Sequence, residues 1–371
     1  MASSLAQWGN DLYTGKRSYD IVGHRRRWYM ISAALVVLTS ALLLGRELNP
    51  GIEFRGGAEF IVNGVSDTSQ QVATDAVTSV LPEDTPRVSV VGDDSVRVQT
   101  GELDDLETRE VADALAEAYQ VAPTEISSNF VGPSWGADVS SKAIRGLVVF
   151  LALTALVMTL YFRAWRMAAA ALVALAHDLI ITVGLYSAIG WEVTPATVIG
   201  FLTILGYSLY DTVVVFDKVR ENTHKVLEQK RYTYAELANL AVNQTLVRSI
   251  NTSVVALLPV SAILFIGAFI LGAGTLRDIA LALFIGLIVG AFSSIYLATP
   301  FQVSLRQREP AIAEHTAKVL AARSQAAAAG EGGAPAGRSV VHVGAPVPGT
   351  HLGTAAQPKR RKPARPAGRR P

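Results

Sequence analysis

The chain has 371 residues, of which 50% are hydrophobic and only 17% charged, and its mean hydropathy is +0.32. A soluble domain carries about 25% charged residues, so this composition argues against an ordinary water-soluble enzyme. The sequence has no cysteine, which excludes disulfides, thiolate metal sites and cysteine nucleophiles, and its net charge of +2 hides a segregation: residues 47–141 contain 18 acidic side chains and four basic ones.

Apolar runs long enough to cross the hydrocarbon of a membrane begin near the N-terminus. About 18 apolar residues are needed for one crossing, and residues 28–46 supply the first run directly after three arginines. This run continues into Arg46 and Glu47 without a small-residue cleavage site, so we interpret it as a retained membrane anchor. Further runs follow at 146–162, 167–191, 193–216, 249–270 and 279–300. The pattern predicts an α-helical polytopic membrane protein with one plus five helices, the five forming a bundle over residues 143–302.

Lysine and arginine are concentrated in segments that we expect on the cytoplasmic side. These segments are residues 1–27, the connector 217–248 and the tail 303–371. An even number of crossings places both termini in the cytoplasm, and the acidic segment 47–142 then lies outside. The sequence thus predicts a multi-pass membrane protein with both termini in the cytoplasm.

The segment 47–142 has the patterning of a small soluble domain. Strands are expected at 58–62, 87–91, 95–98 and 125–130, and helices at 69–81 and 103–119. This βαββαβ order is typical of a ferredoxin-like α+β domain. The segment shows no nucleotide loop, paired catalytic carboxylates or serine triad, so we predict a binding or mechanical role rather than an enzyme.

The tail changes composition twice. Residues 311–329 are alanine-rich and could form a helix, whereas residues from 330 onward mix glycine, proline and alanine with basic residues and are expected to be disordered. Such a tail could bind anionic membrane lipids or ribosomal RNA. We favour a solvated tail that helps to set orientation, and predict no specific nucleic acid partner.

Two carboxylates lie within the apolar runs, where an ionisable residue costs about 2.5–3.5 kcal/mol to insert. They are Asp178 in the third run and Asp211 in the fourth. Tyr207 and Ser208 lie four and three positions before Asp211, and Thr203 lies one turn further, so a polar stripe is expected on this helix. Asp211 could pin helix packing, or it could carry a proton next to a movable cation.

Arg248, at the start of the fifth run, is the available cation for Asp211. His177 and Asp178 should point about 100° apart on their helix, so we do not expect them to pair. Asp178 is left open between a proton path and a structural hydrogen bond, and Asp217 is expected to fix a helix end. Gly286 and Gly290 form a Gly-x-x-x-Gly pattern that allows close helix packing.

Three stretches of the chain together resemble the SecF family of bacterial protein export, which is related to the resistance-nodulation-division transporters. They are NPGIEFRGG at 49–57, GYSLYDTVVVFDKVREN at 206–222, and the pair formed by 243–253 and 276–286. The resemblance covers roughly residues 20–305. The family usually has Asp, Asn and Arg where this chain has Glu53, Tyr210 and Lys218.

The resemblance implies an accessory subunit of the Sec export machinery in the bacterial plasma membrane, which works with SecD and uses the proton gradient to promote preprotein translocation. It also implies a set of site residues. Asp211 and Arg248 match the family's proton-pathway positions, and we add Asp178, Ser208 and Tyr207 to the candidate pathway. Protons are the expected coupling ion, with no other cofactor and no metal. A hinge or turn is expected just after the first span, at Gly51, Glu53, Phe54, Gly56 and Gly57.

The resemblance also implies partners. These are SecD, which would complete a twelve-helix unit, the SecY, SecE and SecG channel with its SecA motor, and unfolded preproteins. Two alternatives remain open on the residues alone: a proton-coupled exporter of small molecules or lipids, and a passive scaffold of the translocation channel. A single small domain in a six-span chain argues against the exporter.

Overall fold

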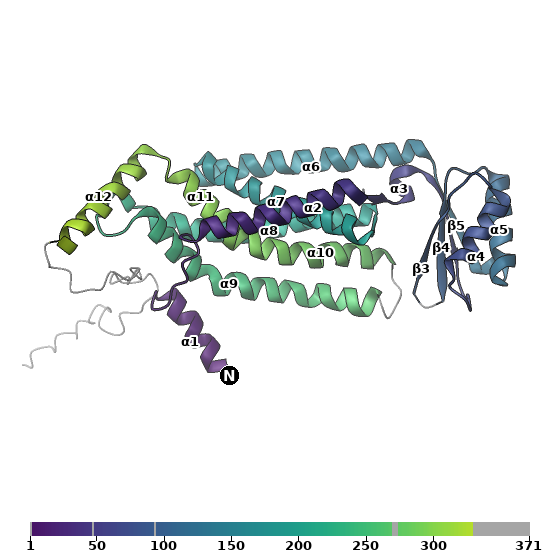
Figure 1. Cartoon of the computed structure of the whole chain (residues 1–371), viewed down its shortest axis with the longest axis horizontal. Helices are drawn as coiled ribbons and strands as arrows, with labels where there is room; N and C mark the ends of the chain where they lie inside the picture. Colours follow the sequence, from purple (N-terminus) through teal and green to yellow (C-terminus); the bar gives the residue numbers. More distant parts are fainter. Residues whose placement is uncertain (1, 47, 93, 269–273, 329–371) are drawn as a thin grey trace, which may run out of the picture.

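The computed structural model describes residues 2–46, 48–92, 94–268 and 274–328. A long bundle of helices carries a small α+β domain at one end (Figure 1). We call this the domain end of the bundle, and the opposite end, where α1 (Ala2–Tyr13), α11 (Thr299–Arg306) and α12 (Pro310–Ala328) lie, the terminal end. The fold class expected from the sequence is confirmed.

Six helices in the described residues are long and apolar enough to cross a membrane. The bundle elements are α2 (Arg25–Arg46), α6 (Pro133–Phe162), α7 (Trp165–Ile189), α8 (Pro195–Thr223), α9 (Tyr234–Ala262) and α10 (Gly274–Ser293). Two of them continue as π-helical turns, α9 into η3 (Ile263–Ala268) and α10 into η4 (Ser294–Ala298). The predicted arrangement of one plus five spans is therefore confirmed.

Helices extend beyond the apolar runs, so several expected boundaries shift. α6 begins at Pro133, inside the segment 47–142 that was assigned to the α+β domain. The expected connector 217–248 is mostly helical, since α8 continues to Thr223 and α9 begins at Tyr234 behind a capping box formed by Thr233 and Glu236. Asp217 thus lies within α8 and does not fix its end. Hydrophobicity marks only the part of a helix that faces hydrocarbon, and capped polar turns continue past it.

The α+β domain has the predicted order of elements. Its strands and helices are β2 (Gly57–Val62), α4 (Gln70–Val80), β3 (Arg87–Val91), β4 (Ser95–Thr100), α5 (Asp105–Tyr119) and β5 (Ile126–Val131). The strands form one antiparallel sheet in the order β3-β4-β2-β5. Phe60, Val98 and Leu115 are fully buried in its core, between the sheet and the helices α4 and α5 (Figure 1). Alternation along β2 and β4 leaves Glu59, Arg97 and Gln99 on the opposite face of the sheet.

Short backbone pairings join the domain to the bundle. β1 (Asn49–Pro50) pairs in parallel with β6 (Glu192–Val193), which lies between α7 and α8. α3 (Ile52–Arg55) packs against α6, where a Cβ at Gly136 would lie 2.8 Å from the carbonyl oxygen of Phe54. The chain between α2 and β2 is therefore fixed to the bundle at two points, through β1 and through α3.

The terminal end is held by polar contacts from segments at both ends of the chain. Asn239 and Asn243 of α9 bind the backbone of residues 19–22. Arg323 of α12 makes a bidentate contact of 2.7 and 2.8 Å with Glu236 of α9. The helix expected at 311–329 is confirmed, and the first part of the tail 303–371 is ordered on the bundle. The predicted disorder from residue 330 lies outside the described residues.

Small residues set the helix spacing in the bundle. A Cβ at Gly286 of α10 would lie 2.2 Å from the side chain of Ile204 on α8, and one at Gly290 would lie 3.0 Å from Cβ of Ser208. At Gly184 of α7 a Cβ would lie 2.7 Å from the carbonyl oxygen of Thr39 on α2. The close packing expected for Gly286 and Gly290 is confirmed, and Gly184 adds a contact of the same kind.

We predict that Gly184→Ala destabilises the protein by about 1–3 kcal/mol, because the new methyl group meets backbone that a rotamer change does not move. Gly146→Ala on α6 is the matched control, since its Cβ would meet nothing within 4 Å. The measurement is thermal unfolding of the purified protein in detergent. Equal midpoints for the two variants would contradict this account of α2 and α7 packing.

Candidate functional site

Two aspartates are buried in the interior of the bundle. Asp178 of α7 is 0% exposed and Asp211 of α8 is 4% exposed. Oδ2 of Asp178 accepts hydrogen bonds from Ser208 Oγ at 2.6 Å and Ser293 Oγ at 2.7 Å. The interior therefore supplies hydroxyl groups around this carboxylate.

Asp211 has a similar environment. Ser249 Oγ of α9 donates to its Oδ1 at 2.9 Å, and Ser294 Oγ of η4 donates to its Oδ2 at 2.8 Å. A hydroxyl can donate to an ionised carboxylate and can accept from a protonated one. Each aspartate can consequently be satisfied in either protonation state, which is the property that a proton-binding group in a membrane requires.

Ser293 and Ser294 are consecutive residues that bind different aspartates. They lie where α10 gives way to the π-helical turn η4, a type of irregularity that is frequent at functional sites. Neither serine is among the site residues predicted from the sequence. Both serines follow Gly290, a glycine that lets α10 approach Ser208 and Asp178. This position after a close-packing glycine is the signal that could have identified them.

Arg248 does not contact Asp211 in this structure. It is exposed on α9 and its Nη2 lies 3.4 Å from the hydroxyl of Tyr210, so the expected ion pair is absent. Ser249 of α9 occupies the position beside Asp211, and the guanidinium of Arg248 lies at Tyr210 instead.

The predicted polar stripe on α8 is only partly correct. Ser208 binds Asp178 rather than Asp211, Tyr207 donates to the carbonyl oxygen of Thr252 at 2.7 Å, and Thr203 is exposed. This part of α8 thus carries Asp211, binds Asp178 of α7 through Ser208 and binds the backbone of α9 through Tyr207.

His177 and Asp178 do form a pair, contrary to expectation. The ring Nδ1 lies 3.0 Å from Asp178 Oδ1. The offset of about 100° between neighbours applies to their Cβ atoms, whereas the ring nitrogen and the carboxylate oxygen lie further out and can converge. Within the part of the chain that the structure describes, the buried Nε2 atom of His177 has no hydrogen-bond partner.

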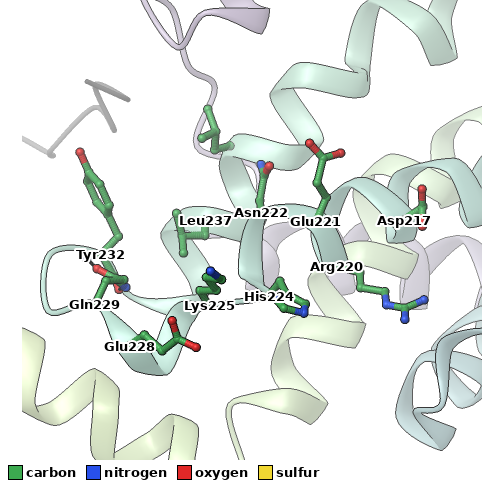
Figure 2. Close-up of a pocket in the computed structure, with 11 residues that line it drawn as sticks. Asp217, Arg220, Glu221, Asn222, His224, Lys225, Glu228, Gln229, Tyr232 and Leu237 are labelled. Carbon is green, nitrogen blue, oxygen red and sulfur yellow. Dashed lines mark hydrogen bonds between the residues drawn. The ribbon is translucent and has the colours of Figure 1, made fainter. Parts of the chain in front are cut away.

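Two cavities lie at the terminal end of the bundle. One, of about 730 Å³, is polar, is bordered by α1, α8 and α9, and reaches Arg248 together with Asp217, Lys218 and Glu221. The lining of the other, of about 950 Å³, includes His224 and charged residues of both signs (Figure 2): Asp217, Arg220, Glu221, Lys225 and Glu228. Arg248 is thus accessible from the terminal end, whereas Asp211 is not exposed.

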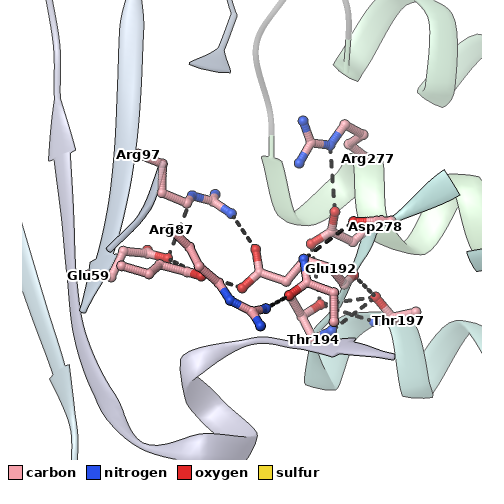
Figure 3. A network of polar contacts seen from close by, with 11 residues as sticks. Glu59, Arg87, Arg97, Glu192, Thr194, Thr197, Arg277 and Asp278 are labelled. Carbon is pink, nitrogen blue, oxygen red and sulfur yellow. Dashed lines mark hydrogen bonds and ion pairs between the residues drawn. The ribbon is translucent and has the colours of Figure 1, made fainter. Parts of the chain in front are cut away.

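A further polar cavity of about 730 Å³ lies between the sheet and the domain end of the bundle. Its lining includes Glu53, Glu59, Arg97, Glu192 and Asp278, most of which are joined by the contacts in Figure 3. Burial raises the pKa of Glu53, and the nearby carboxylates of Glu192 and Glu59 raise it further.

Of the predicted hinge residues, Glu53 lines this cavity. Gly56 and Gly57 have φ of +84° and +125°, which favour glycine, and a Cβ at Gly57 would lie 2.4 Å from the carbonyl oxygen of Thr100. Gly51 leaves room for two carboxylates, since a Cβ there would lie 2.5 Å from Glu53 Oε2 and 2.8 Å from Glu192 Oε1. Phe54 packs against an apolar cluster of the bundle. The structure shows a tight turn here, and its role as a hinge stays a prediction.

An apolar layer separates the domain-end cavity from the two aspartates. Its buried members on α7, α8 and α10 lie along each helix between the cavity and the aspartate region: Tyr186, Phe201, Ile204, Ala280, Leu281 and Ala282. Among the described residues, no group of three or more acidic or histidine side chains is placed to hold a metal ion. The arrangement is that of buried, protonatable groups closed from one end.

Comparison with known proteins assigns a family. Residues 110–308 match the family model "Protein export membrane protein SecD/SecF, C-terminal". The chain is 46% identical to protein translocase subunit SecF of Streptomyces coelicolor over 333 residues, which cover 89% of this chain and 88% of that protein. It is 43% identical to SecF of Mycobacterium tuberculosis (strain CDC 1551 / Oshkosh), with coverage of 86% and 74%.

A solved structure agrees with these sequence matches. The crystal structure of SecDF, a translocon-associated membrane protein from Thermus thermophilus, superposes with a TM-score of 0.70 at 30% identity. The match covers 79% of this chain and 39% of the SecDF chain, so this chain spans about two fifths of that protein. With its six apolar helices, buried aspartates and α+β domain, the chain belongs to the SecF family of protein translocase subunits.

Proposed function

We propose that this accessory subunit of the Sec protein-export machinery uses the proton gradient across the bacterial plasma membrane to promote preprotein translocation. The observation that carries the proposal is the pair of buried aspartates, each bound by hydroxyl groups that suit both of its protonation states. An ionisable residue at membrane depth is costly and is rare without a function. One charge moving through 100 mV supplies about 2.3 kcal/mol, which is enough to bias a domain movement.

Asp211 is the proposed proton carrier and Arg248 its intermittent partner. In the described conformation Asp211 binds two serines, while Arg248 faces a polar cavity at the terminal end. A rotation of α9 by about one residue would exchange Ser249 for Arg248 next to Asp211. A nearby cation favours the ionised carboxylate, so this exchange would release the proton toward the terminal end. Asp178, Ser208 and Tyr207 complete the proposed pathway.

SecD is the proposed main partner. The SecDF protein of Thermus thermophilus extends well beyond the region matched by this chain, as its 39% coverage indicates. Tyr210, Arg248 and Asn251 are polar residues exposed on α8 and α9. At membrane depth such residues face protein or water rather than lipid, so a second subunit fits this face. The SecY, SecE and SecG channel, SecA and unfolded preproteins are the further proposed partners.

The proposed orientation places both termini in the cytoplasm and the α+β domain outside. Because the chain has no cysteine, single cysteines report accessibility without background. We predict that Ser127→Cys in β5 reacts with an impermeant maleimide in intact cells. Ser324→Cys in α12 should react only after the membrane is opened. Labelling with the opposite pattern would reverse the orientation.

Asp211→Asn should assemble with SecD and lose the part of export that depends on the proton gradient. Asparagine keeps the size and much of the hydrogen bonding of aspartate but does not titrate. The measurement is export of a reporter preprotein into inverted membrane vesicles with ATP present, before and after an uncoupler collapses the gradient. Asp113→Asn, at an exposed position of α5, is the matched control and should retain the full uncoupler-sensitive component. Retention of that component in Asp211→Asn would favour a passive scaffold.

Arg248→Lys should retain only part of the gradient-dependent export. Lysine keeps the charge but lacks the planar group that can hold a carboxylate through two hydrogen bonds. Arg248→Gln should lose the gradient-dependent part, while Arg145→Lys at an exposed position of α6 should leave it unchanged. The same vesicle assay measures all three. If Arg248→Gln exports like the wild type, Arg248 is only a flanking surface charge.

A further inference from the structure

We propose that Glu192 is a positioning residue that links the two aspartate-bearing helices to the α+β domain, so that their movement is transmitted to the domain through its side chain. The inference rests on the proposed proton coupling and names the contact through which that coupling leaves the bundle.

Glu192 occupies a short connection between the two helices that carry the aspartates. α7, with Asp178, ends at Ile189, and α8, with Asp211, begins at Pro195. Glu192 lies in β6, the two-residue strand in this connection. A shift of α7 or α8 along its axis therefore moves Glu192 directly.

The carboxylate of Glu192 is held by the sheet of the α+β domain (Figure 3). Its Oε2 lies 3.1 Å from Arg97 Nη1, and its Oε1 accepts a hydrogen bond of 2.6 Å from Gln99 Nε2. Both donors are on β4, and both also contact Glu59 of β2, at 3.6 Å from Arg97 Nε and 3.0 Å from Gln99 Nε2. The side chain thus joins the connection between α7 and α8 to the two central strands of the sheet.

This contact is stronger than an ordinary surface ion pair. The Arg97 and Glu192 side chains are each only 15% exposed, and two donors converge on one carboxylate. Partial burial reduces screening by water and salt, and a charge-assisted hydrogen bond is about twice as strong as a neutral one. The backbone adds a second connection, since β1 pairs with β6 and the amide of Gly51 donates to the carbonyl oxygen of Val193 at 3.0 Å.

The same connection is fixed to the bundle two residues further on. Thr194 caps α8 through a capping box with Thr197 and donates to Asp278 Oδ2 of α10 at 3.3 Å. Tyr186 of α7 donates to the carbonyl oxygen of Asp278 at 2.9 Å. The connection between α7 and α8 is therefore expected to move with α7, α8 and α10, the helices that carry Asp178, Asp211 and Ser293. A chain of direct contacts therefore runs from the aspartate helices to the sheet.

The test uses Ser95→Cys as a reporter of the domain end. Ser95 lies at the start of β4 and borders the same cavity as Glu192. The rate of maleimide labelling is measured in membranes that contain the full chain with SecD, with and without a proton gradient. We expect the gradient to change this rate in the otherwise unaltered chain. Glu192→Gln and Arg97→Gln should each abolish the change, and the double variant should add nothing.

Controls separate this effect from a general loss of charge. Arg109→Gln and Glu117→Gln remove the same kinds of charge from exposed positions of α5 and should retain the gradient-dependent change. Asp211-dependent proton flux out of energised inverted vesicles should remain in Glu192→Gln and Arg97→Gln, while their uncoupler-sensitive export is lost. Proton flux without export is the result that supports a transmitting contact.

The possible failures are distinguishable. If the gradient changes labelling in Asp211→Asn as it does in the unaltered chain, the proposed proton carrier is wrong. If the change requires Asp211 but persists in Glu192→Gln, the inference about Glu192 is overturned. It is also overturned if the unaltered chain shows gradient-dependent export without a labelling change, or if Glu192→Gln loses the Asp211-dependent proton flux, since Glu192 would then support the proton site itself.

Discussion

A carboxylate buried among membrane helices must have hydrogen-bond donors, and this requirement shapes the centre of the protein. Asp178 and Asp211 together draw serine hydroxyls from α8, α9 and α10 with its π-helical turn. Those helices must approach closely for the hydroxyls to reach, which Gly290 allows by leaving space beside Ser208. The need to supply hydrogen-bond donors to two buried carboxylates therefore accounts together for the close helix spacing, the π-helical turn after Ser293 and the burial of the aspartates.

The bundle is chemically different at its two ends. Beyond the aspartates toward the α+β domain, apolar side chains of α7, α8 and α10 close the interior. At the terminal end, a polar cavity reaches Arg248. This asymmetry is compatible with the proton coupling that we propose, in which Arg248 is the group approached from the terminal end.

In the proposed coupling, the connection between α7 and α8 is the mechanical output of the bundle. The sheet binds Glu192, and Thr194 caps α8 and binds Asp278 of α10. The α+β domain and the bundle are thus joined within residues 192–194. Longer side chains at Gly51 would displace the carboxylates gathered there. The glycines of the turn after α2 thus serve two purposes: Gly56 and Gly57 permit an unusual backbone, and Gly51 makes room for charge.

The sequence by itself determined the class of the fold, since the length and spacing of apolar runs set the number of spans and alternating patterns set the order of the α+β domain. It also identified Asp178 and Asp211, because a carboxylate in an apolar run is conspicuous whatever surrounds it. Only the tertiary structure decided their partners: Ser293 and Ser294 lie far away in sequence, His177 turns toward Asp178, and Arg248 faces away from Asp211. Periodicity gives the direction in which a side chain leaves its own helix. Contacts depend in addition on how neighbouring helices are rotated and how closely they pack, and the sequence of a single helix does not specify either.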